Sequence, residues 1–262
     1  MRCNLALRII TSVLCLVLML PILVVLAASI NDQSYLSFPP ETISLRWFDS
    51  FFGDIRWRNA LYTSLIIGFL TCLISTSIGF LGAYSFVRGR YRGKKLLLSI
   101  VLMPLIVPHI ITAIALYFLS APLGLIGSKL WISIGHSVIA LPIVVLILIS
   151  ALQNVDESLE RAAFGMGASR ALTFRTIVIP LILPGVVSAA LFSFLTSFDE
   201  LIIGLFLSGV LSETLQVRIW NSLLMEAEPV IAAVSAFLIL STVAILGAES
   251  LVRHNRKKII SS

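Results

Sequence analysis

The sequence predicts an all-α membrane protein with six transmembrane helices in a single domain of residues 1–262. Three observations support this fold class. Hydrophobic residues make up 58% of the chain, far above soluble globular proteins. Charged residues make up only 12% and gather in clusters between apolar runs. Each run has about the 20 residues that a helix needs to cross a bilayer. The expected spans are 9–30, 60–87, 96–120, 131–152, 181–207 and 230–251.

The first span and the segment after it have the features of a membrane anchor and a membrane interface. Arg2 and Arg8 precede residues 9–30, and residues 27–29 (Ala-Ala-Ser) resemble a signal-peptide cleavage site. The apolar stretch exceeds the roughly 7–15 residues of a signal-peptide core, so we expect a retained anchor. The aromatic residues of segment 31–59 favour an interfacial position on the outer face.

Small residues and prolines distinguish the second and third spans. Pro104 and Pro108 interrupt residues 96–120, where freed backbone carbonyls can line a cavity. In the second span, small residues recur at every fourth position, which places each row on one helix face and favours close packing between helices. The rows are Ser64, Gly68, Cys72 and Thr76, and Thr71, Ser75, Gly79 and Ala83.

The basic residues predict how the chain is oriented in the membrane. Six spans place both termini on the same side, and 14 of the 19 Lys and Arg residues fall on that side, against 5 on the other. Basic residues collect in cytoplasmic loops, so we expect both termini to be cytoplasmic. The net charge of +6 follows from this orientation, and we expect membrane lipid, not nucleic acid, around the chain.

A polar segment at 154–176, between the fourth and fifth spans, is expected to fold as a helix–turn–helix. Asn154 followed by Glu157 resembles a capping box at a helix start. Gly167 favours a helix end, and Ser169 can cap a second short helix. A plain solvated loop is the alternative, but two capped turns favour a docking surface. Between them runs an apolar stripe at helical spacing, formed by Leu159, Ala162, Ala163 and Met166.

The same segment resembles the EAA loop of ABC-transporter permeases, in which Glu-Ala-Ala, three residues and Gly-Ala-Ser precede a hydrophobic-x-Leu-Pro. This chain reads ERAAFGMGAS and then IVIP. It departs from the pattern in having Arg161 at the usual glutamate, with Glu160 one place early, and Ile179 at the usual leucine. The residues that the resemblance implies in ATPase coupling are Glu160, Arg161, Ala162, Ala163, Gly167, Ala168, Ser169, Phe174 and Pro180.

The resemblance implies the type I ABC importer permease fold in a bacterial inner (plasma) membrane, with 154–176 as a cytoplasmic coupling loop. No Gly-x-x-x-x-Gly-Lys-Ser/Thr phosphate loop occurs, so we expect a partner ATPase, not this chain, to bind ATP and Mg. Cys3, Cys15 and Cys72 lack metal-like spacing, and no hydrolase motif is present. We therefore expect a transport subunit that is not an enzyme and that holds no metal or cofactor.

Polar residues inside the spans are candidates for the solute path, because such groups are costly in lipid and seldom face it. Ser197, Asp199 and Glu200 lie in the fifth span, and His109 follows Pro108 in the third. Two adjacent carboxylates in apolar surroundings favour a solute with an amine, and we expect Asp199 to face the path. The alternatives are a helix-end pair bonded to a neighbouring subunit, and for His109 a neutral imidazole bonded to a carbonyl.

The whole chain resembles the second permease of spermidine/putrescine-type importers. The segments that carry this resemblance are Ser-x-Asp-acid at 197–200, Glu-Thr-Leu-Gln-Val at 213–217 and Pro-Val-Ile-Ala-Ala-Val-Ser at 229–235. It implies a heteromeric importer with a second permease, two ATPase subunits and a periplasmic or lipid-anchored substrate-binding protein. Polyamine permeases usually carry an acid after the third-span proline, where this chain has His109. Opines, aminophosphonates and other small solutes therefore stay open as cargo.

Two other classes of membrane protein are weighed against an importer subunit. An ion-coupled secondary carrier often has two related halves with broken helices in matching positions, and no such repeat is visible here. It would also leave the capped cytoplasmic segment unexplained. An intramembrane enzyme needs a nucleophile–base or metal constellation, and none is spaced for one in this sequence.

Overall fold

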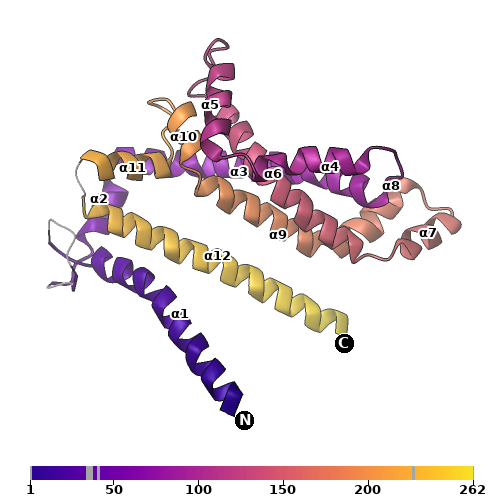
Figure 1. Cartoon of the computed structure of the whole chain (residues 1–262), viewed down its shortest axis with the longest axis horizontal. Helices are drawn as coiled ribbons and strands as arrows, with labels where there is room; N and C mark the ends of the chain where they lie inside the picture. The colour runs from indigo at the N-terminus through magenta and orange to yellow at the C-terminus, as the bar shows by residue number, and fades with distance from the viewer. Residues whose placement is uncertain (1, 34–37, 40–41, 226–227, 262) are drawn as a thin grey trace. The chain divides into compact units, whose positions relative to one another are not determined.

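The computed structural model describes residues 2–33, 38–39, 42–225 and 228–261, with side chains left out at 2–6, 245–246 and 248–261. Within these residues the regular secondary structure is helical apart from an isolated bridge between Asn31 and Ile43 (Figure 1), which confirms the all-α prediction. The basic side chains of the C-terminal tail and Arg2 lie outside the described residues.

The helices follow one another along the chain without a sheet between them in the described part (Figure 1). They are α1 (Arg2–Ser29), α2 (Arg46–Gly53), α3 (Ile55–Arg88), α4 (Lys94–Leu102), η1 (Met103–Leu105), α5 (His109–Ser120), α6 (Lys129–Gln153), α7 (Glu157–Gly165), α8 (Arg170–Thr173), η2 (Phe174–Val178), α9 (Ile179–Phe198), α10 (Ile202–Leu207), α11 (Leu215–Met225) and α12 (Val230–Ser261).

Four helical segments are long and apolar enough to cross a membrane, and a bent pair brings the number to five. The four are Leu7–Ser29, Ile55–Arg88, Lys129–Gln153 and Arg170–Phe198. A shorter apolar stretch, Val230–Ala244, lies in α12. Because apolar side chains cover these helices, their exposed faces match lipid and not water. The chain is therefore a multi-pass helical membrane protein.

Two of the predicted spans are broken. The third, 96–120, bends by 98° between Lys94–Leu105 and His109–Ser120, where proline removes a backbone donor and opposes a continuous helix. The fifth, 181–207, was expected as one segment, but α9 ends at Phe198 and α10 begins at Ile202. The expectation of a single helix through Asp199 is wrong, because the Glu200 side chain caps α10 by accepting the Ile203 N–H at 3.0 Å.

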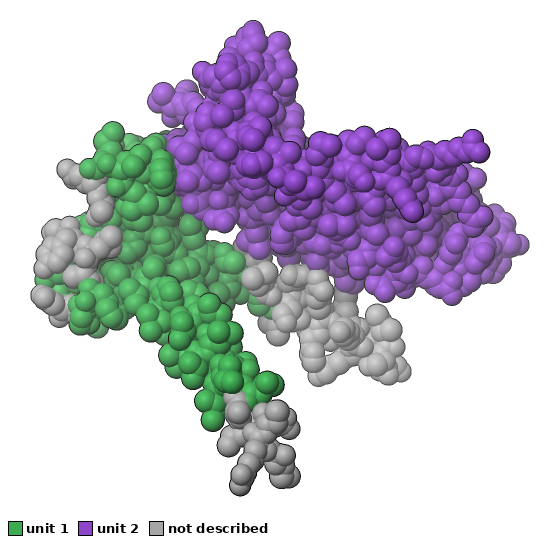
Figure 2. Space-filling view, in the orientation of Figure 1, with its two compact units in different colours: residues 1–59, 218–262 green, residues 60–217 purple. Residues whose placement is uncertain are grey.

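The chain divides into two compact units, residues 1–59 with 218–262 and residues 60–217, coloured separately in Figure 2. In the first unit, α1 packs against α12, and α2 packs against the same helix. Phe51 and Trp57 are 1% and 2% exposed, and the Phe51 ring centroid lies 5.6 Å from that of Phe237. These two aromatic residues are core and not interfacial, contrary to the expectation for segment 31–59.

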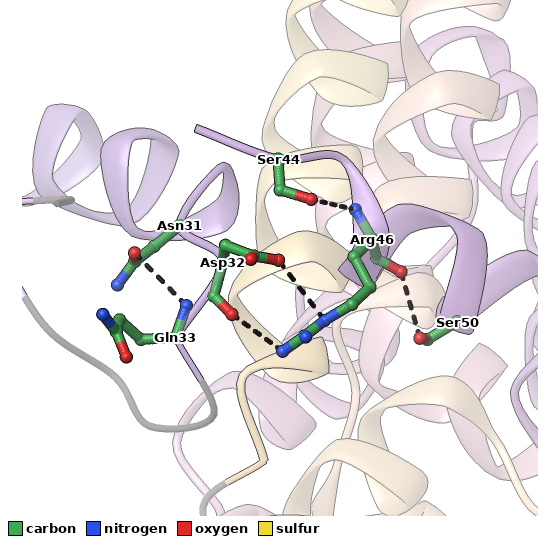
Figure 3. Close-up of polar contacts among 6 residues, drawn as sticks. All are labelled: Asn31, Asp32, Gln33, Ser44, Arg46 and Ser50. Carbon is green, nitrogen blue, oxygen red and sulfur yellow. Dashed lines mark hydrogen bonds and ion pairs between the residues drawn. The ribbon is translucent and has the colours of Figure 1, made fainter. Parts of the chain in front are cut away.

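A polar link closes the connection between α1 and α2 in this unit (Figure 3). Arg46 Nη2 donates to the backbone oxygen of Asp32 at 2.7 Å, and its Nε lies 3.6 Å from Asp32 Oδ1. Both side chains are almost half exposed, so the ion pair contributes little stability. The hydroxyl of Ser50 donates to the backbone oxygen of Arg46 at 3.0 Å, within the first turn of α2.

The core of the second unit lies where α6 packs against α9 and α3. Val144, Leu148 and Leu152 of α6 are fully buried, as is Ala83 of α3. A side chain at Gly79 would bring its Cβ within 2.6 Å of Val144, so α3 and α6 approach closely at this glycine. The row of small residues through Thr71, Ser75, Gly79 and Ala83 is thus the packing surface that its spacing predicts.

Candidate functional site: the coupling segment and the membrane breaks

The segment between α6 and α9 begins with a capped helix, but the cap is not the predicted residue. Asp156 precedes α7, and its Oδ1 accepts the Ser158 N–H at 2.8 Å. Asn154 instead ends α6 and donates through Nδ2 to the Ser150 carbonyl at 2.8 Å. The prediction of Asn154 as the cap is wrong because the α6 hydrogen bonds continue to that residue. The hydrogen bond from the Ser158 N–H holds the pKa of Asp156 below its usual value.

Gly167 and Ser169 shape the turn between the two short helices as the sequence predicts. Gly167 has φ +85°, a left-handed conformation that glycine adopts without strain. The N–H groups of Gly167 and Ala168 donate to Phe164 and Ala163 carbonyls, each at 3.0 Å, which closes the end of α7. Ser169 Oγ accepts the Leu172 N–H at 3.2 Å and caps α8.

A buried ion pair ties this helix pair to the end of α3. Arg88 Nε donates to Glu160 Oε1 at 2.8 Å, with side chains 14% and 7% exposed. Arg88 Nη2 also donates to the Val155 carbonyl at 2.9 Å, and the Tyr84 hydroxyl lies 3.3 Å from Glu160 Oε2. The Phe174 ring packs edge-on against Tyr84, with centroids 5.4 Å apart. The polar segment is therefore a fixed extension of α3, not a free loop.

The outer face of the helix pair is apolar, and the described residues leave it exposed. Leu159, Phe164 and Leu172 are 45%, 43% and 52% exposed, and Met166 is 83% exposed. Of the predicted stripe, only Ala163 is buried; Ala162 is exposed with Leu159 and Met166. Arg161 and Arg170 are exposed on the rim of a cavity of about 730 Å³ between α3, α7 and α8. Ala168 is half-buried, and Pro180 is exposed at the start of α9.

The second candidate site lies where the broken membrane segments meet. His109 Nδ1, at the start of α5, lies 3.2 Å from Glu200 Oε2, with side chains 44% and 7% exposed. Asp199 is exposed and its Oδ1 accepts from Gln216 Nε2 at 3.2 Å. The structure thus brings His109 and Glu200 together, whereas Asp199 lies on the exposed side. Ser197 lies in the last turn of α9, whereas Asp199 and Glu200 lie after its end, so the three residues do not share one helix.

Ser197 belongs to a different polar group from the carboxylates. Its Oγ lies 2.8 Å from His136 Nδ1 and donates to Thr71 Oγ1 at 3.1 Å. Thr71 in turn donates to the Ser133 carbonyl at 3.2 Å. His136, 1% exposed on α6, was missed by sequence reasoning, which gave a place in the solute path to His109 alone among the histidines. The one available signal was its position between Ser133 and Ser137 in an apolar helix. Among the described residues, no cluster of three or more potential metal ligands occurs.

Comparisons with known proteins identify the family to which a chain with these sites belongs. Residues 75–257 match the family described as "Binding-protein-dependent transport system inner membrane component". The spermidine/putrescine transport system permease protein PotC of Haemophilus influenzae is 30% identical over 237 residues, which cover 90% of this chain and 91% of that protein. The putrescine transport system permease protein PotI of Escherichia coli is 32% identical over 211 residues, 78% and 75% of the two chains. The trehalose permease SugB of Mycobacterium tuberculosis is 28% identical, over 73% and 71%.

Solved structures share the fold at low sequence identity. A chain of a bacterial ABC transporter involved in alginate import matches with TM-score 0.70 and 17% identity, over 96% of this chain and 95% of that chain. The same importer in complex with an alginate-bound periplasmic protein matches with TM-score 0.69 and 16% identity, over 97% and 94%. The family model covers most of this chain and the PotC relative nearly all of it. The chain belongs to the family of binding-protein-dependent transport system inner membrane components: it is a permease subunit of an ABC importer, a transport protein without an ATPase of its own.

Proposed function

We propose that the chain forms half of the translocation path of an ATP-driven importer for a polyamine such as spermidine or putrescine, or for a related amine-bearing solute. The observation that carries the solute class is the buried Glu200 carboxylate, 7% exposed, at the meeting point of two broken membrane segments. A carboxylate in such a place needs a cation or donors near it. PotC and PotI, which are named as polyamine permeases and are 30% and 32% identical to this chain, support the same class of solute.

The proposed topology has six spans with both termini in the cytoplasm. It takes α12 as the sixth crossing and the bent pair α4–α5 as the third. The distribution of basic residues, 14 on the proposed cytoplasmic side and 5 outside, supports this orientation. Segment 154–176 then lies in the cytoplasm, and the bend at His109 and the break at Glu200 lie within the membrane.

The helix pair α7–α8 is proposed to couple the path to a partner ATPase. Its exposed apolar residues Leu159, Phe164 and Met166 fit a groove on that subunit, and ATP and Mg are bound there and not by this chain. The Glu160–Arg88 ion pair joins α7 to α3, and α8 leads along the chain into α9. Movement of the groove is therefore passed to both α3 and α9. The assembled importer contains a second permease, which is either a different chain or a copy of this one, two ATPase subunits and a periplasmic or lipid-anchored binding protein.

A different solute is the second candidate, because the relatives do not agree on cargo. SugB is named for trehalose, and the structural neighbour imports alginate, so the same permease fold serves saccharides. His109, where an acid is usual in polyamine permeases, favours an opine, an aminophosphonate or another zwitterionic solute over a pure polycation.

The solute class is tested by uptake with the complete importer in proteoliposomes. Radiolabelled spermidine and putrescine are supplied with their binding protein, and ATP hydrolysis is followed in parallel. We expect amine uptake that depends on ATP and hydrolysis that the loaded binding protein stimulates several-fold. A radiolabelled zwitterion such as an opine and a radiolabelled neutral disaccharide are assayed for uptake in the same way. Uptake of the disaccharide with none of either polyamine or of the zwitterion would refute the amine class and leave the permease role intact.

A further inference from the structure

A contact between His109 and Glu200 joins the two breaks in the membrane segments. His109 is the first residue of α5, directly after the 98° bend, and Glu200 lies in the gap between α9 and α10. The side chains meet at 3.2 Å, and α5 packs against α10 around them. Broken membrane helices are where transporters hold solutes, because helix ends and freed backbone groups line a cavity there. The pair therefore lies at the part of the chain best suited to contact a solute.

The two partners are held unequally. Glu200 is 7% exposed and its Oε1 accepts the Ile203 N–H at 3.0 Å, so the carboxylate is fixed to α10. The His109 side chain is 44% exposed, and among the described residues Glu200 is the one polar side chain that it contacts. A competing donor can therefore replace the imidazole at Oε2 without disturbing the bond that fixes the carboxylate.

We propose that His109 is a displaceable internal hydrogen-bond partner, which occupies Glu200 in the empty permease and gives way to an ammonium group of the solute. This rests on the proposed function and adds the recognition site and its ligand class. An ammonium carries a full charge and three donors, so it suits a carboxylate that has one oxygen already satisfied. Because an unpaired buried carboxylate is costly, Glu200 stays paired throughout, first with His109 and then with the solute.

Displacement of His109 also changes the contact between the two segments. The His109–Glu200 contact is the polar link between the start of α5 and the gap that precedes α10. When the solute replaces the imidazole, this link is lost, whereas the apolar cluster of Ala113, Ile203 and Leu207 between α5 and α10 does not depend on it. The bend and the break then become free to separate, so occupation by the solute and opening of the path are one event.

The proposal predicts opposite effects from two substitutions at one position. His109→Ala removes the competitor, and His109→Lys replaces it with a permanent charge. We expect the Kd of radiolabelled spermidine for the permease–ATPase complex without binding protein to fall about threefold in the first, the size of one hydrogen bond between membrane helices, and to rise by a similar factor in the second. Glu200→Gln should weaken binding on the order of tenfold or more. ATP hydrolysis without solute should rise in His109→Ala.

A fixed structural strut would give a different pattern. Weaker spermidine binding in both His109→Ala and His109→Lys, with unchanged solute-free ATP hydrolysis, would overturn the proposal. Asp199→Asn is the matched control, because it removes an exposed carboxylate one residue away; a larger loss there than in Glu200→Gln would also overturn it. If the wild-type importer moves no amine, the proposed function fails. Solute-free ATP hydrolysis in His109→Ala still tests whether the His109–Glu200 contact restrains the permease. The two failures are therefore distinguishable.

Discussion

The two ends of α9 carry polar interruptions of very different construction. At its start, α7 and α8 are shaped by contacts between near neighbours: Asp156 with Ser158, and Ser169 with Leu172. At its end, the groups around Asp199 are held by partners far away in the sequence, including His109 and Gln216. One end is thus a preformed surface feature, whereas the other exists only when several membrane segments are assembled.

This difference indicates which end can keep its shape while the other moves. Caps and a glycine turn are satisfied within one segment, so the helix pair remains folded as a rigid body when a partner pushes it. The break at Glu200 depends on contacts between segments, and such contacts can be exchanged. In the proposed mechanism, the helix pair at one end of α9 transmits the motion of the ATPase, and the exchangeable contacts at the other end respond to it.

The largest effect is expected where the rigid end depends on one long-range contact. Arg88→Ala would leave Glu160 buried without its cation, and breaking a buried pair in this way costs about 3–5 kcal/mol. We expect a clear fall in the thermal midpoint of the purified complex and loss of the ATP hydrolysis that the loaded binding protein stimulates. Differential scanning fluorimetry in detergent and a phosphate-release assay measure the two quantities.

Arg161→Ala is the matched control for stability, because Arg161 is a neighbouring arginine that is exposed. It should leave the thermal midpoint unchanged. Glu160→Gln combined with Arg88→Met removes both charges, and it should recover part of the stability that Arg88→Ala loses. Equal thermal midpoints for Arg88→Ala and wild type would show that the Arg88–Glu160 ion pair does not stabilise the helix pair.

Sequence reasoning predicted the local features of the chain far better than the long-range ones. The helical class, the apolar segments and the turn at Gly167 follow from composition and from signals within four residues. The Arg88–Glu160 and His136–Ser197 contacts join residues 72 and 61 positions apart, and nothing in a single sequence marks such partners. Arg88 was counted only among the basic residues of the proposed cytoplasmic side, and His136 was given no role.

The break in the fifth segment could not be predicted for a related reason. Residues 181–207 carry no charged side chain except those of Asp199 and Glu200, and a continuous helix is the simplest interpretation of such a run. The helix ends because Glu200 caps α10 and pairs with His109, which depends on the position of α5. The choice of Asp199 as the inward carboxylate relied on the Ser-x-Asp resemblance, which carries no information about the break between α9 and α10.

A medium effect is expected at the turn that local signals did predict. Gly167 has φ +85° and open space around its Cα, so a side chain there is opposed by backbone strain and not by a clash. Gly167→Ala should cost about 1–2 kcal/mol and reduce stimulated ATP hydrolysis. Gly165→Ala is the control: Gly165 is helical with open space, so alanine should be neutral or stabilising by roughly 0.5 kcal/mol. Similar losses in both would mean that bulk on this face matters, not the turn.

The smallest effect is expected at the Asp156 cap, and it depends on pH. The hydrogen bond from Ser158 lowers the pKa of Asp156, so its stabilisation is present above the ordinary value of 3.8 and is lost as pH falls through the lower folded value. Asparagine caps a helix almost as well as aspartate but carries no charge. Asp156→Asn should therefore lower the thermal midpoint slightly at pH 7, and the gap to wild type should close toward pH 3. Asn154→Ala removes the residue that the sequence pattern marked as the cap and changes no charge. Its midpoint difference from wild type should stay constant over the same range. A larger midpoint loss in Asn154→Ala than in Asp156→Asn, with no closing of the Asp156→Asn gap toward pH 3, would return the cap to Asn154.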